Sequence, residues 1–326
     1  MKKFRIATRS SQLALWQANY MSDLIHSIAS DIEVELVDVT TIGDQDQSQP
    51  LRTLGGTGVF TREVQQAVLD SRAEIAVHSL KDLPTVVVAP ELTLACVPPR
   101  ANRWDALVLP ANSSLEIDPE NPLSCLAPGS RIGSGSPRRQ AQLKANRPDL
   151  KLLEIRGNLS TRLQKLDAGE YDAIILAAAG LQRLGWDERL SALLMPPLMY
   201  PAVGQGALGI ECRADDERTR SLLAQLTDPE TQLATVTERT VLAQLQAGCH
   251  APVGISCSID QQTISVQVIV LSQDGQQSLL EKATATLPID SDFSSNQSQQ
   301  IAINLGKNIA NNLLAQGADA LIAEQP

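Results

Sequence analysis

The first two thirds of the chain repeat one pattern, in which a short apolar run gives way abruptly to polar or glycine residues and then to an amphipathic segment. The stretch Glu74–Pro84 shows it most clearly, because the apolar residues Ile75–Val77 are followed at once by polar and charged side chains. Short apolar runs of this kind are typical of strands buried on both faces of a parallel sheet. Their alternation with helices predicts α/β lobes with parallel sheets.

This alternation predicts two α/β lobes along the chain. Strands are expected at residues 4–8, 33–40, 75–77, 92–97, 106–109, 131–133, 151–155, 171–179 and 207–212. Hydroxyl side chains that can cap helix N-termini stand where several of the intervening helices are expected to begin, namely Ser10 or Ser11, Thr61 and Ser136. Pro137 suits the first position of the helix after Ser136.

The last third of the chain has a different pattern. A helix rich in good helix formers is expected from about residue 231 to 246, with Gly248 as its C-terminal cap. Three strand-like runs follow at residues 255–259, 263–271 and 279–287, and a final helix is expected to end near Ala315. This order predicts a small α+β domain with an antiparallel sheet.

The composition excludes several classes of protein. The 326 residues suffice for two or three domains, and a net charge of -10 argues against general nucleic-acid binding, which needs a basic face. We find no apolar secretory segment at the start and no run approaching the ~18 apolar residues of a membrane span. Five scattered cysteines and three histidines without metal-ligand spacing favour reduced thiols in the cytoplasm and no metal site.

The placement of arginine breaks a local rule repeatedly. A helix N-terminus is electropositive and disfavours basic residues by a few tenths of a kcal/mol each. Nevertheless, arginines stand at or just before expected helix starts or in strand-to-helix turns: Arg9, Arg138, Arg139, Arg156, Arg162 and Arg183. Any one of them could extend into solvent or pair with an acid. As a set, they predict a cleft that binds several carboxylates or phosphates.

Three further places in the chain suggest chemistry or binding. Lys81 and Asp82 follow a buried strand, so one could hold an anion while the other manages a proton or a positive charge, although a solvated turn with a weak ion pair is the alternative. The glycine-rich residues 43–58 are expected to form a lid or binding loop. Cys249 follows a helix end, and its neighbour His250 is poorly placed for a Cys-His hydrolase because adjacent side chains rarely orient for proton transfer.

Several motifs, taken in order, resemble those of one known family: Arg5–Arg9, Ala76–Asp82, Arg138–Gln140, Arg156–Asn158 with Thr161–Leu163, Tyr171–Ala177, Pro201–Ala207 and Gly248–Cys249. They extend over nearly the whole chain, and their number and order make chance similarity a poor explanation. The chain thus resembles the porphobilinogen deaminases, also called hydroxymethylbilane synthases, of tetrapyrrole biosynthesis.

The resemblance implies a transferase that joins four porphobilinogen molecules head to tail, releases ammonia and then hydrolyses off hydroxymethylbilane, on the route to porphyrins, heme and chlorophyll. It implies a covalent dipyrromethane cofactor, attached to Cys249 through a thioether, and no metal. The implied partners are porphobilinogen and the growing linear polypyrrole. The enzyme is expected to be a cytoplasmic monomer that binds neither nucleic acid nor membrane.

The resemblance also implies roles for individual residues. Asp82 is expected to contact the pyrrole nitrogens and to stabilise positive charge as ammonia leaves. Cofactor binding is expected of Asp82 and Cys249 together with Ser79, Lys81, Ser134, Ser136, Arg138, Arg139 and Arg156. Substrate binding is expected of Arg9, Arg162, Arg183 and Gln205. Since each pyrrole unit carries two carboxylates, a row of arginines within an acidic protein agrees with this chemistry.

The fold implied by the family is α/β, with two lobes resembling periplasmic binding proteins and a small α+β C-terminal domain with a three-stranded antiparallel sheet. Domain 1 is expected to comprise residues 1–101 and 202–224, including the catalytic Asp and the lid loop. Domain 2, residues 105–200, is expected to hold the arginine-rich anion site, and domain 3, residues 228–326, the cofactor-bearing cysteine.

The sequence departs from the family in places, and other functions stay open. Many members have lysines where this chain has Thr53 and Thr57, although Arg52 could supply one of the charges. A non-catalytic two-lobed protein that binds a small polycarboxylate would explain the lobes and the arginines, but not Cys249 or the third domain. A phosphosugar or nucleotide transferase would explain the Ser134–Ser136 turn, but the chain lacks the Gly-Lys-Ser/Thr ending of a P-loop and an acidic metal cluster.

Overall fold

The computed structural model describes residues 3–41, 58, 61–86, 89–248, 251–289 and 291–323. The chain divides into a first unit, residues 1–101 with 207–232, and a second unit, residues 102–206 with 233–326. Apart from Gly58, the expected lid loop lies outside the described residues, as does Cys249. The expected division into three domains is finer than these two units and stays a prediction.

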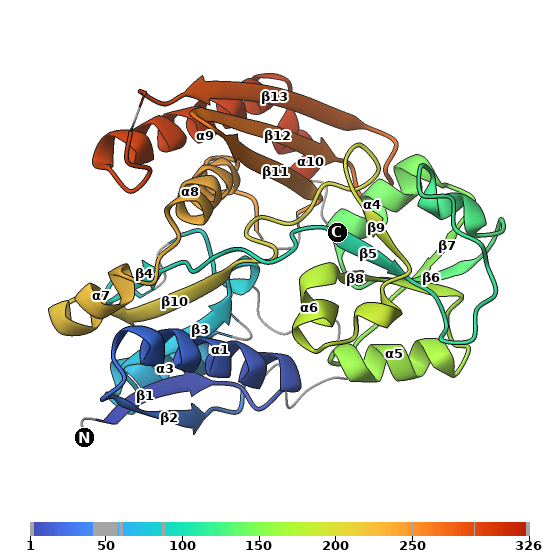
Figure 1. Cartoon of the computed structure of the whole chain (residues 1–326). Coiled ribbons are helices and arrows are strands. Elements are labelled where there is room, and N and C mark those ends of the chain that lie inside the picture. Colours follow the sequence, from blue (N-terminus) through green and yellow to red (C-terminus); the bar gives the residue numbers. More distant parts are fainter. Residues whose placement is uncertain are drawn as a thin grey trace. The chain divides into compact units, whose positions relative to one another are not determined.

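The first unit is built on a five-stranded mixed sheet with the strand order β2-β1-β3-β10-β4. The strands are β1 (Lys3–Thr8), β2 (Glu33–Asp38), β3 (Ile75–Ser79), β4 (Leu92–Cys96) and β10 (Leu208–Arg213). β1 runs parallel to both β2 and β3, whereas β10 lies antiparallel between β3 and β4 (Figure 1). The expected strands of this unit are therefore present.

Helices cover both faces of this sheet because its strands are apolar on both sides. Ile6 and Ala7 alternate on β1, and they fall in two separate hydrophobic clusters. The Ile6 cluster contains Met21 and Ile25 of α1 (Gln12–Ile28), and the Ala7 cluster contains residues of α3 (Arg62–Leu69). The unit also contains a 3-10 helix, η2 (Leu80–Asp82), and helix α7 (Glu217–Ala224).

The predicted helix caps are confirmed in position, but only one of them makes a capping hydrogen bond. Ser11 is the N-cap of α1, and its Oγ accepts from the backbone N–H of Ala14 at 3.3 Å. Thr61 and Ser136 occupy the N-cap positions of α3 and α4, yet neither side chain caps its helix. Pro137 is the first residue of α4, as its fixed φ favours.

The second unit contains a second five-stranded mixed sheet, with the order β7-β6-β8-β5-β9. Its strands are β5 (Asp105–Val108), β6 (Arg131–Gly133), β7 (Lys151–Leu153), β8 (Ala173–Ala177) and β9 (Ala192–Leu194). Its helices are η3 (Pro122–Cys125), α4 (Pro137–Asn146), α5 (Leu159–Asp167), α6 (Ala178–Arg183) and η4 (Asp187–Arg189). β6 is parallel to β7 and β8, and β5 is antiparallel to β8 and β9, so both lobes follow one topology.

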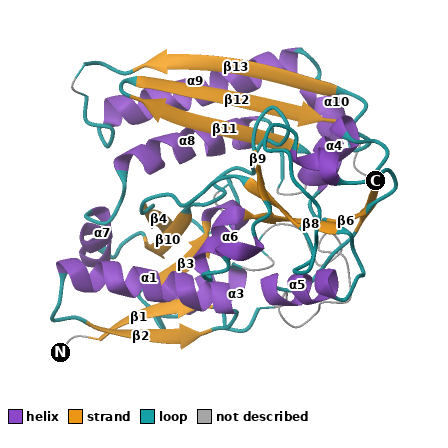
Figure 2. Ribbon diagram, turned by 45° about the vertical axis from the view of Figure 1, so that its right-hand side comes forward, coloured by secondary structure: helices purple, strands orange, loops and turns teal. Residues whose placement is uncertain are grey.

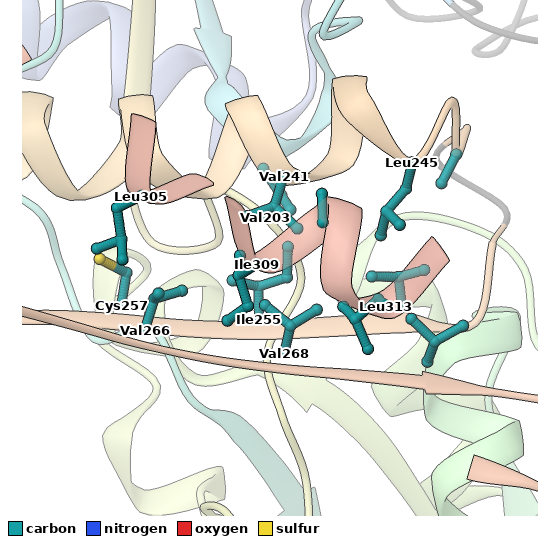
Figure 3. Close-up of a cluster of buried hydrophobic side chains, with 14 of the residues drawn as sticks. Val203, Val241, Leu245, Ile255, Cys257, Val266, Val268, Leu305, Ile309 and Leu313 are labelled. Atoms are coloured by element: carbon teal, nitrogen blue, oxygen red, sulfur yellow. The ribbon is translucent and has the colours of Figure 1, made fainter. Parts of the chain in front are cut away.

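A three-stranded antiparallel sheet follows, as the sequence predicted. It consists of β11 (Val253–Asp260), β12 (Thr263–Leu271) and β13 (Ser278–Thr286), in that order (Figure 2). Helices α8 (Pro229–Gln244), α9 (Asn296–Ala315) and α10 (Ala318–Ala323) accompany it. Leu245 after α8, Ile255 of β11 and Ile309 of α9 meet in one buried cluster (Figure 3). The expected fold class, two α/β lobes and a small α+β part, is thereby confirmed, whereas α10 was not predicted.

The end of α8 differs from the prediction. The backbone N–H of Ala247 donates to Leu242 O at 3.1 Å, and that of Gln246 donates to Ala243 O at 3.0 Å. This pair of bonds is a Schellman motif, and Gln246 takes its left-handed position with φ 51°. The prediction that Gly248 caps the helix was wrong, because the left-handed cap position is Gln246, two residues earlier and not a glycine.

Gly254 is a position where the packing tolerates no side chain. A Cβ there would lie 2.6 Å from Tyr200 Cβ and 2.9 Å from Tyr200 O. We expect Gly254→Ala to destabilise the protein by about 1–3 kcal/mol, because the backbone of Tyr200 must move. Thermal unfolding measures the effect, with Ser258→Ala, an exposed change on the same strand, as the control. Equal melting temperatures for Gly254→Ala and the wild type would contradict the close contact.

Among the described residues, none of the helices combines the length and apolar character that a membrane span requires.

Candidate active site

In the first unit, topology gathers four of the predicted site residues at one edge of the sheet. β1 and β3 are parallel neighbours, so their carboxyl ends lie side by side. Arg9 follows β1, Ser79 ends β3, and Lys81 and Asp82 lie in η2 directly after it. All four are half-buried. We call these residues the first-unit site.

Two residues that the sequence analysis missed hold the first-unit site in place. Gln17 of α1 is buried, and its Nε2 donates to Ser79 Oγ at 2.8 Å. Gly209 of β10 leaves room for η2, because a Cβ there would lie 2.8 Å from Leu80 Cδ1 and 2.9 Å from Leu83 Cδ1. The sequence offered one signal for Gln17, namely a polar residue among the apolar positions of the predicted helix.

Asp82 has no counterion among the described residues. Its carboxylate makes no hydrogen bond or ion pair with them. A half-buried carboxylate acts on a nearby charge more strongly than one in water, because fewer water molecules screen it. Asp82 is thus suited to stabilise a positive charge on a ligand.

His78 lies apart from these residues because alternate side chains of a strand point to opposite faces. It is buried, and its Nε2 lies 3.2 Å from Glu211 Oε2 without hydrogen-bond alignment. Gln65 Nε2 donates to the same oxygen at 2.8 Å. His78 therefore belongs to a buried polar contact between α3, β3 and β10.

The second unit places its predicted site residues on a similar edge. β7, β6 and β8 are parallel, so the turns after them meet. Ser134 and Ser136 follow β6, and Arg156 follows β7. We call the predicted site residues of this unit the second-unit site: Ser134, Ser136, Arg138, Arg139, Arg156, Arg162, Arg183 and Gln205.

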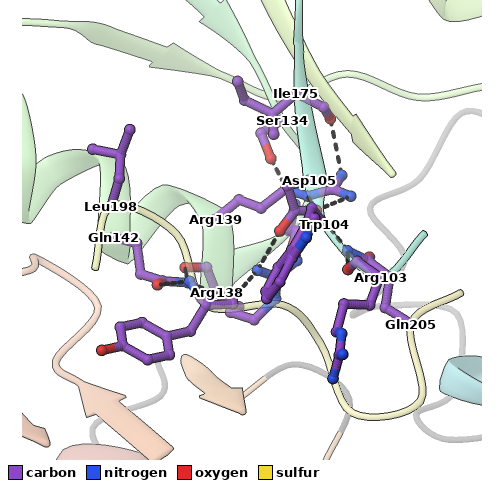
Figure 4. Close-up of polar contacts among 12 residues, drawn as sticks. Arg103, Trp104, Asp105, Ser134, Arg138, Arg139, Gln142, Ile175, Leu198 and Gln205 are labelled. Atoms are coloured by element: carbon purple, nitrogen blue, oxygen red, sulfur yellow. Dashed lines mark hydrogen bonds and ion pairs between the residues drawn. The ribbon is translucent and has the colours of Figure 1, made fainter. Parts of the chain in front are cut away.

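Arg138 and Arg139 point inward onto a buried carboxylate (Figure 4). Arg138 Nη1 donates to Asp105 Oδ2 at 2.7 Å, and Arg139 Nε donates to Asp105 Oδ1 at 2.9 Å. Each guanidinium also donates to a backbone carbonyl, Arg138 to Tyr200 O and Arg139 to Ile175 O. Asp105 was not among the predicted site residues, and its one signal in the sequence is an acid at the start of an apolar strand.

The charges in this cluster do not balance. Asp105 is 0% exposed, and although burial alone would raise its pKa, the two guanidinium groups hold the pKa well below its usual range. Burial lowers the pKa of Arg139, opposed by Asp105 and reinforced by the charge of Arg138. Two buried cations share one carboxylate, and the remaining positive charge favours a bound anion.

Two other arginines of the second-unit site, Arg162 and Arg183, contact backbone carbonyls. Arg162 Nε donates to Gly157 O at 2.8 Å, and Arg183 Nη2 donates to Gly206 O at 2.8 Å. Arg183 ends α6 instead of preceding a helix, so its predicted position in a strand-to-helix turn was wrong. There the helix dipole favours its charge.

Gln205 and Ser134 are buried within the second-unit site. Gln205 is 0% exposed, and its Nε2 donates to Asp105 Oδ1 at 3.0 Å and to Arg103 O at 2.9 Å. Ser134 Oγ accepts from the backbone N–H of Ser136 at 3.3 Å. The structure thus joins Gln205 to the arginine pair through Asp105, while its predicted contact with substrate stays a prediction.

No group of three or more His, Cys, Asp or Glu side chains in the described ranges is placed to hold a metal ion.

Comparison with known proteins decides the family. The profile described as "Porphobilinogen deaminase, dipyromethane cofactor binding domain" matches residues 4–221, and "Porphobilinogen deaminase, C-terminal domain" matches residues 232–315. The chain belongs to the porphobilinogen deaminase family. A porphobilinogen deaminase from Syntrophotalea carbinolica is 41% identical over 319 residues, which cover 98% of this chain and 95% of that protein.

Two solved structures show a distant likeness to this chain. The periplasmic VFT2 domain of BvgS from Bordetella pertussis is 12% identical, with a TM-score of 0.40 over 69% of this chain and 86% of that one. The substrate-binding domain of a molybdenum ABC transporter from Clostridium difficile is 10% identical, with a TM-score of 0.43 over 71% and 95%. Scores this low support no inference about function.

Proposed function

We propose that this chain joins four porphobilinogen molecules head to tail, releasing ammonia, and then hydrolyses off hydroxymethylbilane, with Asp82 as the catalytic carboxylate. The reaction is that of the porphobilinogen deaminase family, transferases of tetrapyrrole biosynthesis, to which the chain belongs. The observation that best supports the assignment of residues is the buried cluster of Arg138, Arg139 and Asp105, with its unbalanced positive charge.

The buried arginines suit the cofactor and the growing product. Each pyrrole unit carries an acetate and a propionate, so the chain of rings becomes a polyanion as it lengthens. A guanidinium binds a carboxylate through paired N–H donors, which fix both its position and its orientation. We therefore assign the carboxylates of the cofactor to Lys81, Ser79, Ser134, Ser136, Arg138, Arg139 and Arg156. We assign those of substrate and product to Arg9, Arg162, Arg183 and Gln205.

Asp82 supplies the electrostatic part of catalysis. Loss of ammonia from porphobilinogen leaves positive charge spread over the pyrrole ring. A carboxylate without a counterion in the described part of the chain, held beside the ring and accepting from its N–H, stabilises that charge more than it stabilises the neutral substrate. Gln17 and Gly209 fix the turn that carries Asp82 through their contacts with Ser79 and Leu80.

The cofactor of the family is a dipyrromethane, and the described residues fit it, because the second-unit site offers buried cations in excess of buried carboxylate. When bound, it supplies the primer that keeps the growing product attached to the protein. We propose Cys249 Sγ as the point of attachment, through a thioether. The flanking elements are α8 and β11, and Cys249 itself lies outside the described residues.

We further propose that the protein acts in the cytoplasm as a monomer, without nucleic-acid or membrane partners. The net charge of -10 supports the absence of nucleic-acid partners, and the five scattered cysteines support the cytoplasm. We also retain the three-domain division at 1–101 with 202–224, 105–200 and 228–326. Separate hydrophobic clusters around β8 and around β12 within the second unit support it.

Intact mass spectrometry of the freshly purified protein tests the proposed function. We expect the wild type to exceed its chain mass by two linked pyrrole units, and Cys249→Ser to have the bare chain mass. Cys125→Ser, which removes a half-buried thiol elsewhere in the chain, is the control and should keep the excess. A wild type that stays bare after incubation with porphobilinogen would instead favour the non-catalytic polycarboxylate-binding protein.

A further inference from the structure

Asp105 is the point at which three segments of the second unit meet. It is the first residue of β5 and is completely buried. Its carboxylate accepts hydrogen bonds from Arg138 and Arg139 of α4 and from Gln205 of the turn that precedes β10 (Figure 4). Because none of its surface is exposed, Asp105 cannot touch a ligand directly.

The two arginines need such a partner because of where they stand. They are the second and third residues of α4, at the electropositive end of a helix whose first turn contains no acid. They are also adjacent in sequence and nearly fully buried, with exposed fractions of 4% and 7%. Two like charges in such a place repel each other and are costly to bury unless an acid is fixed between them.

The contacts with Asp105 orient the arginines without exhausting their donors. Arg138 bonds both carboxylate oxygens, through Nη1 to Oδ2 at 2.7 Å and through Nη2 to Oδ1 at 3.2 Å, which sets the plane of its guanidinium. A guanidinium has five N–H donors, and the contacts with Asp105 and the carbonyls use no more than three in each arginine. Donors therefore remain in each arginine for the carboxylates of a ligand.

Further hydrogen bonds, made by Gln205 and the neighbouring Gly204, hold Asp105 in its position. Gln205 donates to its Oδ1, and the neighbouring Gly204 donates its backbone N–H to Glu238 Oε2 of α8 at 2.8 Å. Glu238 is fully buried, so the turn is held from both sides by buried polar groups. A carboxylate held this firmly can set the geometry of the side chains that bond to it.

We propose that Asp105 is a positioning residue of the anion site: a permanent internal counterion that holds Arg138 and Arg139 in the orientation that binds the carboxylates of the dipyrromethane and of the growing product. It neutralises one of the two positive charges and leaves the other for the ligand. The proposal rests on the proposed function, and it adds a residue that acts through the arginines.

The rate at which the unloaded protein acquires its cofactor tests the proposal. Full-length Asp105→Asn, purified from cells that make no porphobilinogen, is incubated with porphobilinogen, and intact mass is followed with time. Asn keeps the shape and one acceptor but removes the charge. We expect loading to slow by at least ~10-fold, since displacing groups that orient a reactant by about 1 Å can cost more than that. We also expect the rise in melting temperature on loading to become smaller.

The Arg131–Asp172 pair offers a matched control in the same unit. Asp172 accepts from Nε and Nη2 of Arg131 at 3.2 and 2.7 Å, but both side chains are 42% exposed. Asp172→Asn should load at the wild-type rate. A purely structural role for Asp105 would lower the melting temperature of the unloaded protein yet leave the loading rate and the rise on loading unchanged, which would overturn the proposal. If the wild type itself fails to load, the proposed function is at fault instead.

A second variant keeps the test decisive if Asp105→Asn does not fold. Combining it with Arg139→Gln removes one positive charge together with the negative one, so the cluster keeps the net charge that it has in the wild type. This double variant is compared with Arg139→Gln alone, in which Asp105 still orients Arg138. The proposal expects slower loading by the double variant, and equal loading by the two would refute it.

Discussion

Asp82→Asn is expected to lower the turnover of porphobilinogen by at least ~100-fold and to leave the fold intact. The amide keeps the size of the carboxylate and can still accept from a pyrrole N–H, but it has no charge with which to stabilise the cationic ring. The fold is unaffected because Asp82 makes no hydrogen bond or ion pair with the described residues.

Steady-state turnover and melting temperature, measured on the same preparation, test this expectation. Asp23→Asn, at an exposed position of α1 in the same unit, is the matched control and should behave as the wild type. Near-normal turnover by Asp82→Asn would rule out the electrostatic role. A loss of turnover accompanied by a large fall in melting temperature would show that the residue acts on stability instead.

Arg138→Met is expected to slow cofactor loading or weaken substrate binding by about 10- to 100-fold, with little change in melting temperature. A hydrogen bond to a charged group contributes about 1.5–3 kcal/mol, which corresponds to that range. Stability changes little because Asp105 and Arg139 remain as a balanced pair, and Met fills most of the volume.

The same mass and kinetic measurements apply, with Arg131→Met as the control, since it removes a half-exposed arginine that also pairs with an aspartate. That control should load normally. Unchanged loading and kinetics in Arg138→Met would show that the arginine serves only the internal packing of the second unit. Arg138→Met removes a charge that binds the ligand, whereas Asp105→Asn removes the group that orients this charge. Comparing the two variants separates these effects.

Most strands could be predicted from the sequence because strand patterns are local. The predicted parallel pairing was wrong in part, because β10 and β5 run antiparallel to their neighbours, and β9 was not predicted. Apolar runs such as Ile75–Val77 are too short for helices and end in polar residues, and all of the expected strands formed. The run at residues 171–179 was predicted too long, because Ala178 and Ala179 belong to α6. Alanine-rich apolar sequence fits a buried helix as well as a strand, and this ambiguity also misplaced Arg183.

The site could be predicted in part, because the positions of its arginines conflict with local helix preferences. Asp105 gave no comparable signal, since its partners in α4 lie 33 and 34 residues further along the chain. Gln205 was expected to contact substrate on the strength of its motif alone, and a sequence does not reveal that an amide is fully buried. Likewise, the left-handed position at the end of α8 was expected to be Gly248, but Gln246 occupies it.

The strand order of the first sheet has a consequence for synthesis on the ribosome. β3 and β4 are not neighbours, because β10 lies between them, and β10 ends at Arg213. The second α/β sheet needs only residues 105–194. A nascent chain therefore contains every strand of its second sheet before it contains β10 of the first, and until then the edges of β3 and β4 lack the strand that joins them.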